Sequence, residues 1–505
     1  MLNFIGRFVR SQRCFYAVIL LLILQALWIA LTARYPQAFD ENYHLGLIRL
    51  HTQQWLPFFT SQPPDSSVYG AIVRDPSYLY HYLMAVPYQM LRFATDSLTA
   101  QVIGLRLINI GIFVGALFIY RKLFDELGIS RALRNVTLLF FVLLPVVPQL
   151  AGQINYDNLM VLLTALLFLY GVRYYRWVTT ASAGSPLPIV LILQIILTGC
   201  IGSIVKFPFA PIFFALAILL AMITVRRIRR QKSSVINLLE DKDSVPAGMS
   251  KLKLVGLALF TAVSIGLCIE RYGVNMVQYQ APVPKCDMVL SIDECQKYSP
   301  WARDHLFAAT YPEPTALGIA VYPWVWVHRT VYETMFSITS YIDDVWGTVT
   351  YKPYLPLTIV NYTGWTVLFA GGLLAAVFRR HIWRNRGLVL LLAVSAFYLL
   401  VLFVQNFSMY LHTGEAVAIH GRYLVPLYPV LLVVLAIGFA RFFDRERLAT
   451  YRNLFLVVVL LLFLQGGGIV GWIIYSDASW YLQQNYAAER ANWLAKNVLT
   501  KVVHH

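Results

Sequence analysis

Residues 15–33 read FYAVILLLILQALWIALTA, an apolar run without a charged residue. A helix of this length spans the hydrocarbon core of a bilayer, which is roughly 30 Å thick. The run follows a basic N-terminus and is too long for the apolar core of a cleavable signal peptide, so we expect a retained transmembrane helix. Similar runs recur along the chain, and 58% of its residues are hydrophobic against 13% charged. The sequence therefore predicts an all-α integral membrane protein.

About eleven transmembrane helices are expected, at residues 15–33, 101–120, 136–152, 158–173, 187–205, 208–225, 254–272, 358–378, 387–404, 422–442 and 454–475. They form one polytopic domain over residues 1–475, and residues 476–505 follow as an extracytoplasmic tail. The outer loops 34–100, 273–357 and 405–421 are expected to build the functional face.

The basic residues predict the orientation. With the N-terminus in the cytoplasm, the cytoplasmic segments hold 25 of the 41 lysines and arginines but only 7 of the 25 acidic residues. Counting residues 76–93 as another span would place these basic loops outside, against the positive-inside rule. We therefore interpret residues 76–93 as an interfacial or re-entrant helix on the outer face. The net charge of +16 then reflects topology rather than nucleic-acid binding.

The segment DENYH, residues 40–44, follows the first span. Adjacent carboxylates at a membrane surface are costly unless they are solvated, paired or used. In a helix that starts near Asp40, this residue and His44 share a face, which joins a carboxylate and an imidazole. Alternatively, Asp40 caps the helix and Glu41 supports its dipole, which are structural roles.

A second polar segment, RDPSYLYHY, covers residues 74–82. Its proline suits the first turn of a helix, so Asp75 is the expected N-cap. Arg74, Tyr78 and His81 line a polar substrate groove in one interpretation. In the other, the aromatic residues form a belt at the membrane interface.

Two short outward turns carry isolated charges. Tyr156, Asp157 and Asn158 form the turn before the span at 158–173, where Asp157 is either a helix cap or a substrate ligand. Lys206 lies between the spans 187–205 and 208–225. A snorkelling lysine is common at such a place, but the same position suits a phosphate ligand.

The segment IHGRY, residues 419–423, opens a span from the outside with His420, Arg422 and Tyr423. An arginine at a helix N-terminus opposes the helix dipole, so an anionic partner is expected there. The fork geometry of its guanidinium suits phosphate or carboxylate.

The large outer loop 273–357 is rich in aromatic residues that either stack on sugar rings or dock segments on the membrane. They include Trp301, Trp324, Trp326 and Trp346. Cys286 and Cys295 lie outside the reducing cytoplasm, so a disulfide is expected between them. Two cysteines without a nearby histidine cluster make a weak case for zinc.

Taken in order, these motifs resemble the GT-C superfamily of multispanning glycosyltransferases, which use polyprenyl-phosphate-linked sugars. The chain is most similar to a bacterial family of that clan with the pattern Asp-Glu-x-x-His, an Asn/Tyr-Asp turn, a Lys and Gly-Arg-Tyr. The similarity covers residues 15–440. The chain departs from the pattern at Asp75-Pro76-Ser77, where many relatives have His-Pro-Pro or Lys-Pro-Pro. The cysteine-containing loop has no counterpart in the pattern.

The resemblance implies a single inverting displacement with Asp40 as general base, assisted by Glu41, and a donor phosphate held by Lys206 and Arg422. No cofactor is required, although Glu41 and His44 could hold one divalent metal ion. The implied substrate contacts come from the polar residues of all the motifs. They are His44, Arg74, Asp75, Tyr78, His81, Tyr156, Asp157, Asn158, His420 and Tyr423.

The implied partners are a polyprenyl-phosphate-sugar donor, membrane lipids, and an acceptor that is a glycan, a lipid-linked molecule or a protein. The implied location is the bacterial cytoplasmic membrane, with the active site outside. The main alternative is a transporter or flippase for a lipid-linked or anionic substrate, which would place charges near the bilayer midplane in repeated half-structures. A third reading is an anchoring protein that recruits a cell-envelope partner and needs none of the charged motifs.

Overall fold

The computed structural model describes residues 2–181, 187–231, 250–338, 343–345, 348–350, 355–356, 358–444, 448–466, 468–475, 480–481 and 486–503. Trp346 of the aromatic loop and residues 476–479 of the predicted tail lie outside these ranges. The described part is predominantly helical, as predicted.

The helices of the first half are α1 (Leu2–Val9), α2 (Gln12–Thr32), α3 (Glu41–His51), η1 (Ser66–Tyr69), α4 (Leu79–Ala94), α5 (Leu98–Glu126), α6 (Arg131–Leu143), α7 (Val146–Ala151), α8 (Asp157–Thr180), α9 (Ile189–Val205), α10 (Phe209–Gln231) and α12 (Lys251–Cys268). Then come η3 (Ile269–Gly273), α13 (Val274–Tyr279), η4 (Cys286–Met288), α14 (Ile292–Cys295), α15 (Ser299–Thr310), α16 (Ala316–His328) and η5 (Arg329–Met335).

The second half contains α17 (Thr358–Val377), α18 (Arg379–Arg384), α19 (Arg386–Thr413), η6 (Gly421–Leu424), α20 (Tyr428–Phe443), α21 (Ala449–Gly466), α22 (Gly468–Tyr475) and α23 (Tyr486–Val503). Four short strands precede it in antiparallel pairs. β1 (Ser337–Ile338) pairs with β4 (Leu355–Pro356), and β2 (Asp343–Val345) pairs with β3 (Thr348–Thr350).

Eight helices among the described residues are long and apolar enough to cross a membrane, and α9 and α20 are shorter apolar helices. The expected span at 136–152 is divided into α6 and α7, with Pro145 between them. A proline inside a helix removes a backbone hydrogen bond and clashes with the preceding turn, which explains the break. The total of about eleven spans stays a prediction.

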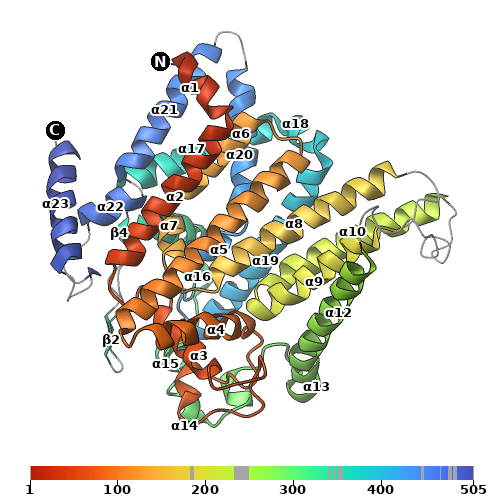
Figure 1. The fold of residues 1–505 in the computed structure, drawn as a ribbon, viewed down its shortest axis with the longest axis vertical. Helices are drawn as coiled ribbons and strands as arrows, with labels where there is room; N and C mark the ends of the chain where they lie inside the picture. Colours follow the sequence, from red (N-terminus) through yellow and green to blue (C-terminus); the bar gives the residue numbers. More distant parts are fainter. Residues whose placement is uncertain are drawn as a thin grey trace.

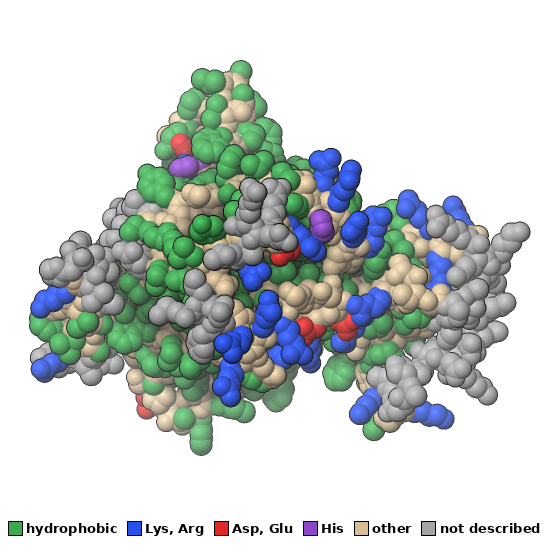
Figure 2. Space-filling view, turned by 90° about the horizontal axis from the view of Figure 1, so that it is seen from above, with side chains coloured by type: hydrophobic (Ala, Val, Ile, Leu, Met, Phe, Trp, Pro, Cys, Tyr) green, Lys and Arg blue, Asp and Glu red, His purple; other side chains and the backbone are tan. Residues whose placement is uncertain are grey.

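The long helices run between two ends of the molecule (Figure 1). We call one of them the basic end, because Lys and Arg side chains gather on it (Figure 2). The turns between α5 and α6 and between α18 and α19 lie at this basic end, together with α1. Figure 2 views the basic end from above and shows Lys and Arg side chains gathered across its middle. We call the opposite end, which carries α3, α4, α14 and α15, the motif end.

Helix α4 is not among the eight candidate spans. One face, with Tyr80, His81 and Tyr88, is buried, whereas Met90 is 69% exposed and Phe93 is 97% exposed. The helix packs between α3 and α5. Its exposed apolar face and its length of 16 residues are typical of a helix that lies at a membrane interface.

Candidate active site

Asp40 forms an ion pair with Arg422, which lies 382 positions later in the sequence. Nη2 of Arg422 donates to Oδ2 of Asp40 at 2.7 Å. The Asp40 side chain is 56% exposed, whereas that of Arg422 is only 9% exposed. Asp40 and the preceding Phe39 both have positive φ, 68° and 69°. Non-glycine residues in this region are strained, and such strain concentrates at functional sites.

Glu41 begins α3 and is fully buried against Arg106 of α5. The two side chains form a bidentate pair, with Nε–Oε1 at 2.8 Å and Nη2–Oε2 at 2.7 Å. The carboxylate also accepts from the backbone N–H groups of Gln37 at 2.7 Å and Ile154 at 3.1 Å. Glu41 therefore fastens the start of α3 to α5 and to the turn before α8.

Arg106 was missed in the sequence. It lies inside the predicted span 101–120, where a charged residue is costly unless it is paired. Its guanidinium also donates to the backbone carbonyls of Ala30, Ala33 and Arg34 at the end of α2. The lone arginine in an apolar run was the signal that could have identified it.

Asp157 and Lys206 form a second, almost fully buried ion pair. Oδ1 of Asp157 accepts from the Lys206 ammonium, and the side chains are 1% and 3% exposed. The other oxygen of Asp157 lies 4.0 Å from Nε of Arg422. The Lys206 ammonium lies 4.4 Å from the ring centroid of Tyr156 and 4.7 Å from that of Tyr423. Aromatic faces stabilise a partly desolvated cation.

The four charged residues Asp40, Asp157, Lys206 and Arg422 thus form one cluster with no net formal charge. We call it the charged tetrad. Nε and Nη1 of Arg422 are buried and have no hydrogen-bond partner. Buried N–H groups of a guanidinium are costly to leave unpaired, so they point to a missing acceptor.

A row of three buried histidines begins with His44, next to the tetrad, and continues through His81 to His51. Nδ1 of His44 and Nε2 of His81 are 2.9 Å apart, and the His81 ring is parallel to that of His51 at 6.5 Å between centroids. Burial lowers the pKa of all three, with that of His51 falling to about 4. The His44 ring contacts the ring of Tyr156 at 4.5 Å. The row is therefore neutral near pH 7.

The segment 74–82 lies against η3, and its helix starts later than expected. The N-cap of α4 is Tyr78, not Asp75. Asp75 instead accepts from the backbone N–H of Ser77 at 2.8 Å, and this local turn competes with helix formation. Tyr43 donates to the same carboxyl group at 3.4 Å. Burial raises the pKa of Asp75.

Arg74 and Tyr78 contact a group of side chains that the sequence had not suggested. Arg74 lies 3.8 Å from Glu270, and the buried Arg271 lies 5.3 Å from the Tyr78 ring. Arg271 also donates to the backbone carbonyl of Phe59 at 3.0 Å. This group holds the loop before α4 against η3.

Two other predicted site residues, Asn158 and His420, form hydrogen bonds that support the fold. Asn158 donates to Oδ1 of Asn109 at 3.0 Å and to the carbonyls of Leu150 and Gln153. The prediction of Asp157 as helix cap is wrong, because α8 begins at Asp157 and Tyr156 is its N-cap. Nδ1 of His420 accepts from the Arg422 backbone N–H at 2.9 Å and so caps η6.

The large outer loop reaches the site through Tyr298. Cys286 and Cys295 form a disulfide in this loop, and Tyr298 follows three residues after the second cysteine. Burial raises the pKa of the Tyr298 hydroxyl, and the nearby carboxylates of Asp75 and Asp40 raise it further. The Tyr298 hydroxyl, which the motifs did not predict, therefore experiences the charge of Asp40 and of Asp75.

Among the described residues, no group of three or more His, Cys, Asp or Glu is arranged to hold a metal ion. The oxygens of Glu41 are engaged by Arg106 and backbone N–H groups, and Nδ1 of His44 contacts His81. A divalent ion at Glu41 would have to compete with Arg106 for the carboxylate oxygens, whereas Nε2 of His44 has no hydrogen-bond partner among the described residues.

No protein-family model matches the sequence, and no curated protein matches it. Solved structures similar to the chain include the Archaeoglobus fulgidus oligosaccharyltransferase tethered with an acceptor peptide, at 12% identity and a TM-score of 0.43. Its apo form gives 14% and 0.42, and the enzyme in complex with an inhibitory peptide and a dolichol-phosphate gives 13% and 0.39.

These matches cover 96% of this chain but only 59–60% of those chains, so this chain spans about three fifths of their length. At TM-scores below 0.5 the likeness assigns neither an activity nor functional residues to the chain.

Proposed function

We propose that the protein transfers a sugar, a hexosyl or pentosyl group, from a polyprenyl-phosphate-linked donor to an acceptor at the motif end. The observation that carries this proposal is the charged tetrad. It combines two cations suited to a lipid phosphate with one carboxylate that is accessible to an acceptor. The reaction is a single inverting displacement at the anomeric carbon.

The leaving group is a lipid phosphate, which cations can stabilise without a general acid. Arg422 is suited to this role because its Nε and Nη1 groups are buried and lack acceptors. Lys206 lies on the other side of Asp157 and is screened from solvent. A phosphate bound between Lys206 and Arg422 would take the place of the carboxylates of Asp40 and Asp157, which pair with these cations in the structure.

Asp40 is the general base in this proposal. Its side chain is 56% exposed, whereas that of Asp157 is 1% exposed, so Asp40 is the tetrad carboxylate within reach of an acceptor hydroxyl. A phosphate that takes up the Arg422 guanidinium releases Asp40 from its ion pair. Donor binding would thereby prepare the base to accept the acceptor proton.

The neighbouring residues have supporting roles. Glu41 positions Asp40 through its buried pair with Arg106. His44, Tyr156 and Tyr423 form the walls around the tetrad and are offered as sugar contacts, and Asp75 and Tyr298 as acceptor contacts. We place the protein in the bacterial cytoplasmic membrane with the basic end in the cytoplasm, because the basic loops obey the positive-inside rule.

The test replaces Asp40 with asparagine in cells and profiles the envelope glycans. Loss of a general base typically lowers a rate by roughly 10²–10⁴-fold, so the product glycan should nearly disappear. The purified variant should bind polyprenyl phosphate at least as tightly as the wild type, because Arg422 loses a competing carboxylate. Arg422→Gln should weaken that binding.

Asp65→Asn is the matched control. Asp65 is also an exposed aspartate with positive φ, 56°, in the same outer loop, and its side chain forms no cap hydrogen bond. This variant should leave glycans and binding unchanged. Wild-type glycans in cells that carry only fully expressed Asp40→Asn protein would refute the assignment of the base.

A further inference from the structure

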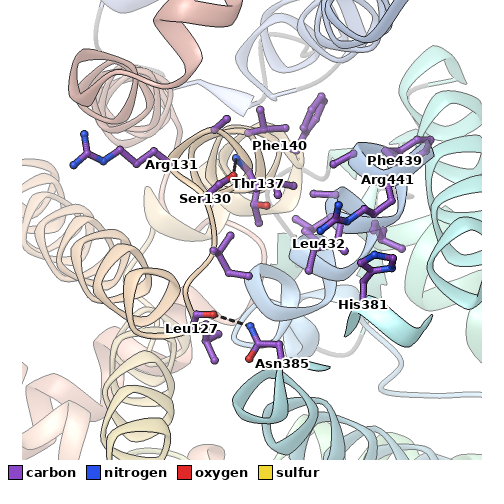
Figure 3. Close-up of a pocket in the computed structure, with 18 of the residues that line it drawn as sticks. Leu127, Ser130, Arg131, Thr137, Phe140, His381, Asn385, Leu432, Phe439 and Arg441 are labelled. Atoms are coloured by element: carbon purple, nitrogen blue, oxygen red, sulfur yellow. Dashed lines mark hydrogen bonds between the residues drawn. The ribbon is translucent and has the colours of Figure 1, made fainter. Parts of the chain in front are cut away.

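A cavity of about 1240 Å³ lies between the helices at the basic end, and none of the four tetrad residues lines it (Figure 3). Its volume exceeds the roughly 300–1,000 Å³ of typical small-molecule pockets. The walls come from α6, α17, α20 and α21 and are largely apolar, with Thr137 and Arg441 among the polar residues on them. The apolar residues include Phe140, Leu144, Leu368, Leu432, Phe439 and Leu456.

The mouth of the cavity is basic. Arg384 and Arg386 flank the turn between α18 and α19, and among the described residues neither forms an ion pair with a carboxylate. Arg441 extends from α20 toward the middle of the cavity (Figure 3). Its partner Asp444 lies 3.4 Å away, and both side chains are about half exposed, so this pair is weak.

The N-terminus of α19 lies at the same mouth of the cavity. Asn385, Arg386 and Gly387 line the cavity, and α19 is 28 residues long. The positive end of its dipole adds to the field of the arginines. The mouth therefore favours an anion, while the interior favours hydrocarbon.

We propose that this cavity binds an anionic glycerophospholipid from the leaflet at the basic end. The lining follows α20 from Leu432 to Asp444, about 18 Å at the rise of an α-helix. That depth is close to one leaflet of a hydrocarbon core that is roughly 30 Å thick. Basic pockets between transmembrane helices on the cytoplasmic side are known to bind anionic head groups.

Other occupants fit less well. A polar metabolite or nucleotide would place many of its polar atoms against the phenylalanine and leucine side chains of the walls, where those atoms would lack partners. A polyprenyl chain is much longer than the cavity is deep. A zwitterionic lipid fits the walls but gains nothing net from the arginines at the mouth.

One part of the cavity lining lies close in the chain to a residue that contacts the segment carrying Arg422. Met335 and Phe336 line the cavity, and the adjacent Thr334 accepts from the backbone N–H of Gly421 at 2.6 Å. Arg422 follows Gly421 directly. A lipid chain against Met335 and Phe336 would therefore couple occupancy at the basic end to the geometry at the motif end.

The experiment titrates the delipidated full-length protein with phosphatidylglycerol or phosphatidylcholine and measures bound lipid by native mass spectrometry. Phosphatidylglycerol should bind preferentially. The double variant Arg384→Gln/Arg386→Gln should weaken its binding roughly fivefold for each arginine, about twenty-fivefold in all. Ala436→Phe, which fills the cavity without changing charge, should reduce the binding of both lipids.

Arg379→Gln/Arg380→Gln is the matched control, because it removes two arginines of α18, the helix that carries Arg384, and neither of them lines the cavity. It should leave phosphatidylglycerol binding unchanged. Equal binding of the two lipids, or equal effects of the two double variants, would overturn the proposal. Tighter binding of polyprenyl phosphate than of phosphatidylglycerol at this cavity would also overturn it.

Discussion

Replacing Arg106 with glutamine should destabilise the protein by about 3–5 kcal/mol, the usual cost of leaving one partner of a buried ion pair without the other. Both side chains of the Arg106–Glu41 pair are 0% exposed, so water cannot take the place of the lost guanidinium. Glu41 would keep only the two backbone N–H groups of Gln37 and Ile154 as donors. The carbonyls of Ala30, Ala33 and Arg34 would lose a donor as well.

The measurement is the free energy of unfolding from urea titrations in mild detergent, together with glycan transfer by the folded fraction. Transfer should fall as well, because Glu41 directly follows Asp40 and fixes the start of α3. Arg106→Met/Glu41→Gln removes the uncompensated charge and should recover more than half of the lost stability. Its transfer rate should stay low, because the anchor of Asp40 is still absent.

Arg173→Gln supplies the control at the basic end. The arginine of that pair is 40% exposed, and a solvated ion pair of this kind typically contributes about 0–1 kcal/mol. A loss below 1 kcal/mol for Arg106→Gln, or a double variant that is no more stable than the single one, would refute the reasoning.

Two further predictions separate charge from structure at the motif end. Lys206→Met should destabilise the fold by about 3–5 kcal/mol, because it leaves the buried Asp157 carboxylate without its cation. Adding Asp157→Asn should restore most of the free energy of unfolding but not the affinity for polyprenyl phosphate. Restored affinity would remove Lys206 from the phosphate site. The fold should also lose stability as the pH falls from about 6.5 toward 4. Burial lowers the pKa of His44, His51 and His81, so in this pH range these histidines bind protons in the unfolded chain but stay neutral in the folded chain. Three such groups give at most about 4 kcal/mol per pH unit; urea titrations of a His51→Gln variant should show a shallower pH slope than the wild type, and identical slopes would contradict this explanation.

The helical membrane fold could be predicted because its signal is local. Each apolar run carries enough residues to cross a bilayer, and the loop charges indicate a side without any knowledge of packing. Boundaries depended on competing local bonds that the pattern does not reveal. Asp75 bonds to the backbone of Ser77 instead of capping a helix, and Pro145 divides a run that looked continuous.

The partners of the charged residues could not be predicted, because pairing depends on how distant helices pack. Asp40 and Arg422 are separated by 382 positions, and the sequence around either residue does not predict that the two will pair. The sequence predicts either a helix cap or a substrate ligand at Asp157, whereas in the structure its carboxylate pairs with Lys206. Placing the motifs on one side of the membrane limits the possible partners but does not select among them.

The zero net charge of the tetrad has a kinetic consequence. An uncompensated pair of cations would attract phosphates from solution over a Debye length, and free anions would compete for the site. Two carboxylates beside two cations cancel that distant field and leave only the short-range interactions. On the proposed function, a donor would find the site by diffusing within the plane of the membrane, and soluble phosphate would remain a poor competitor.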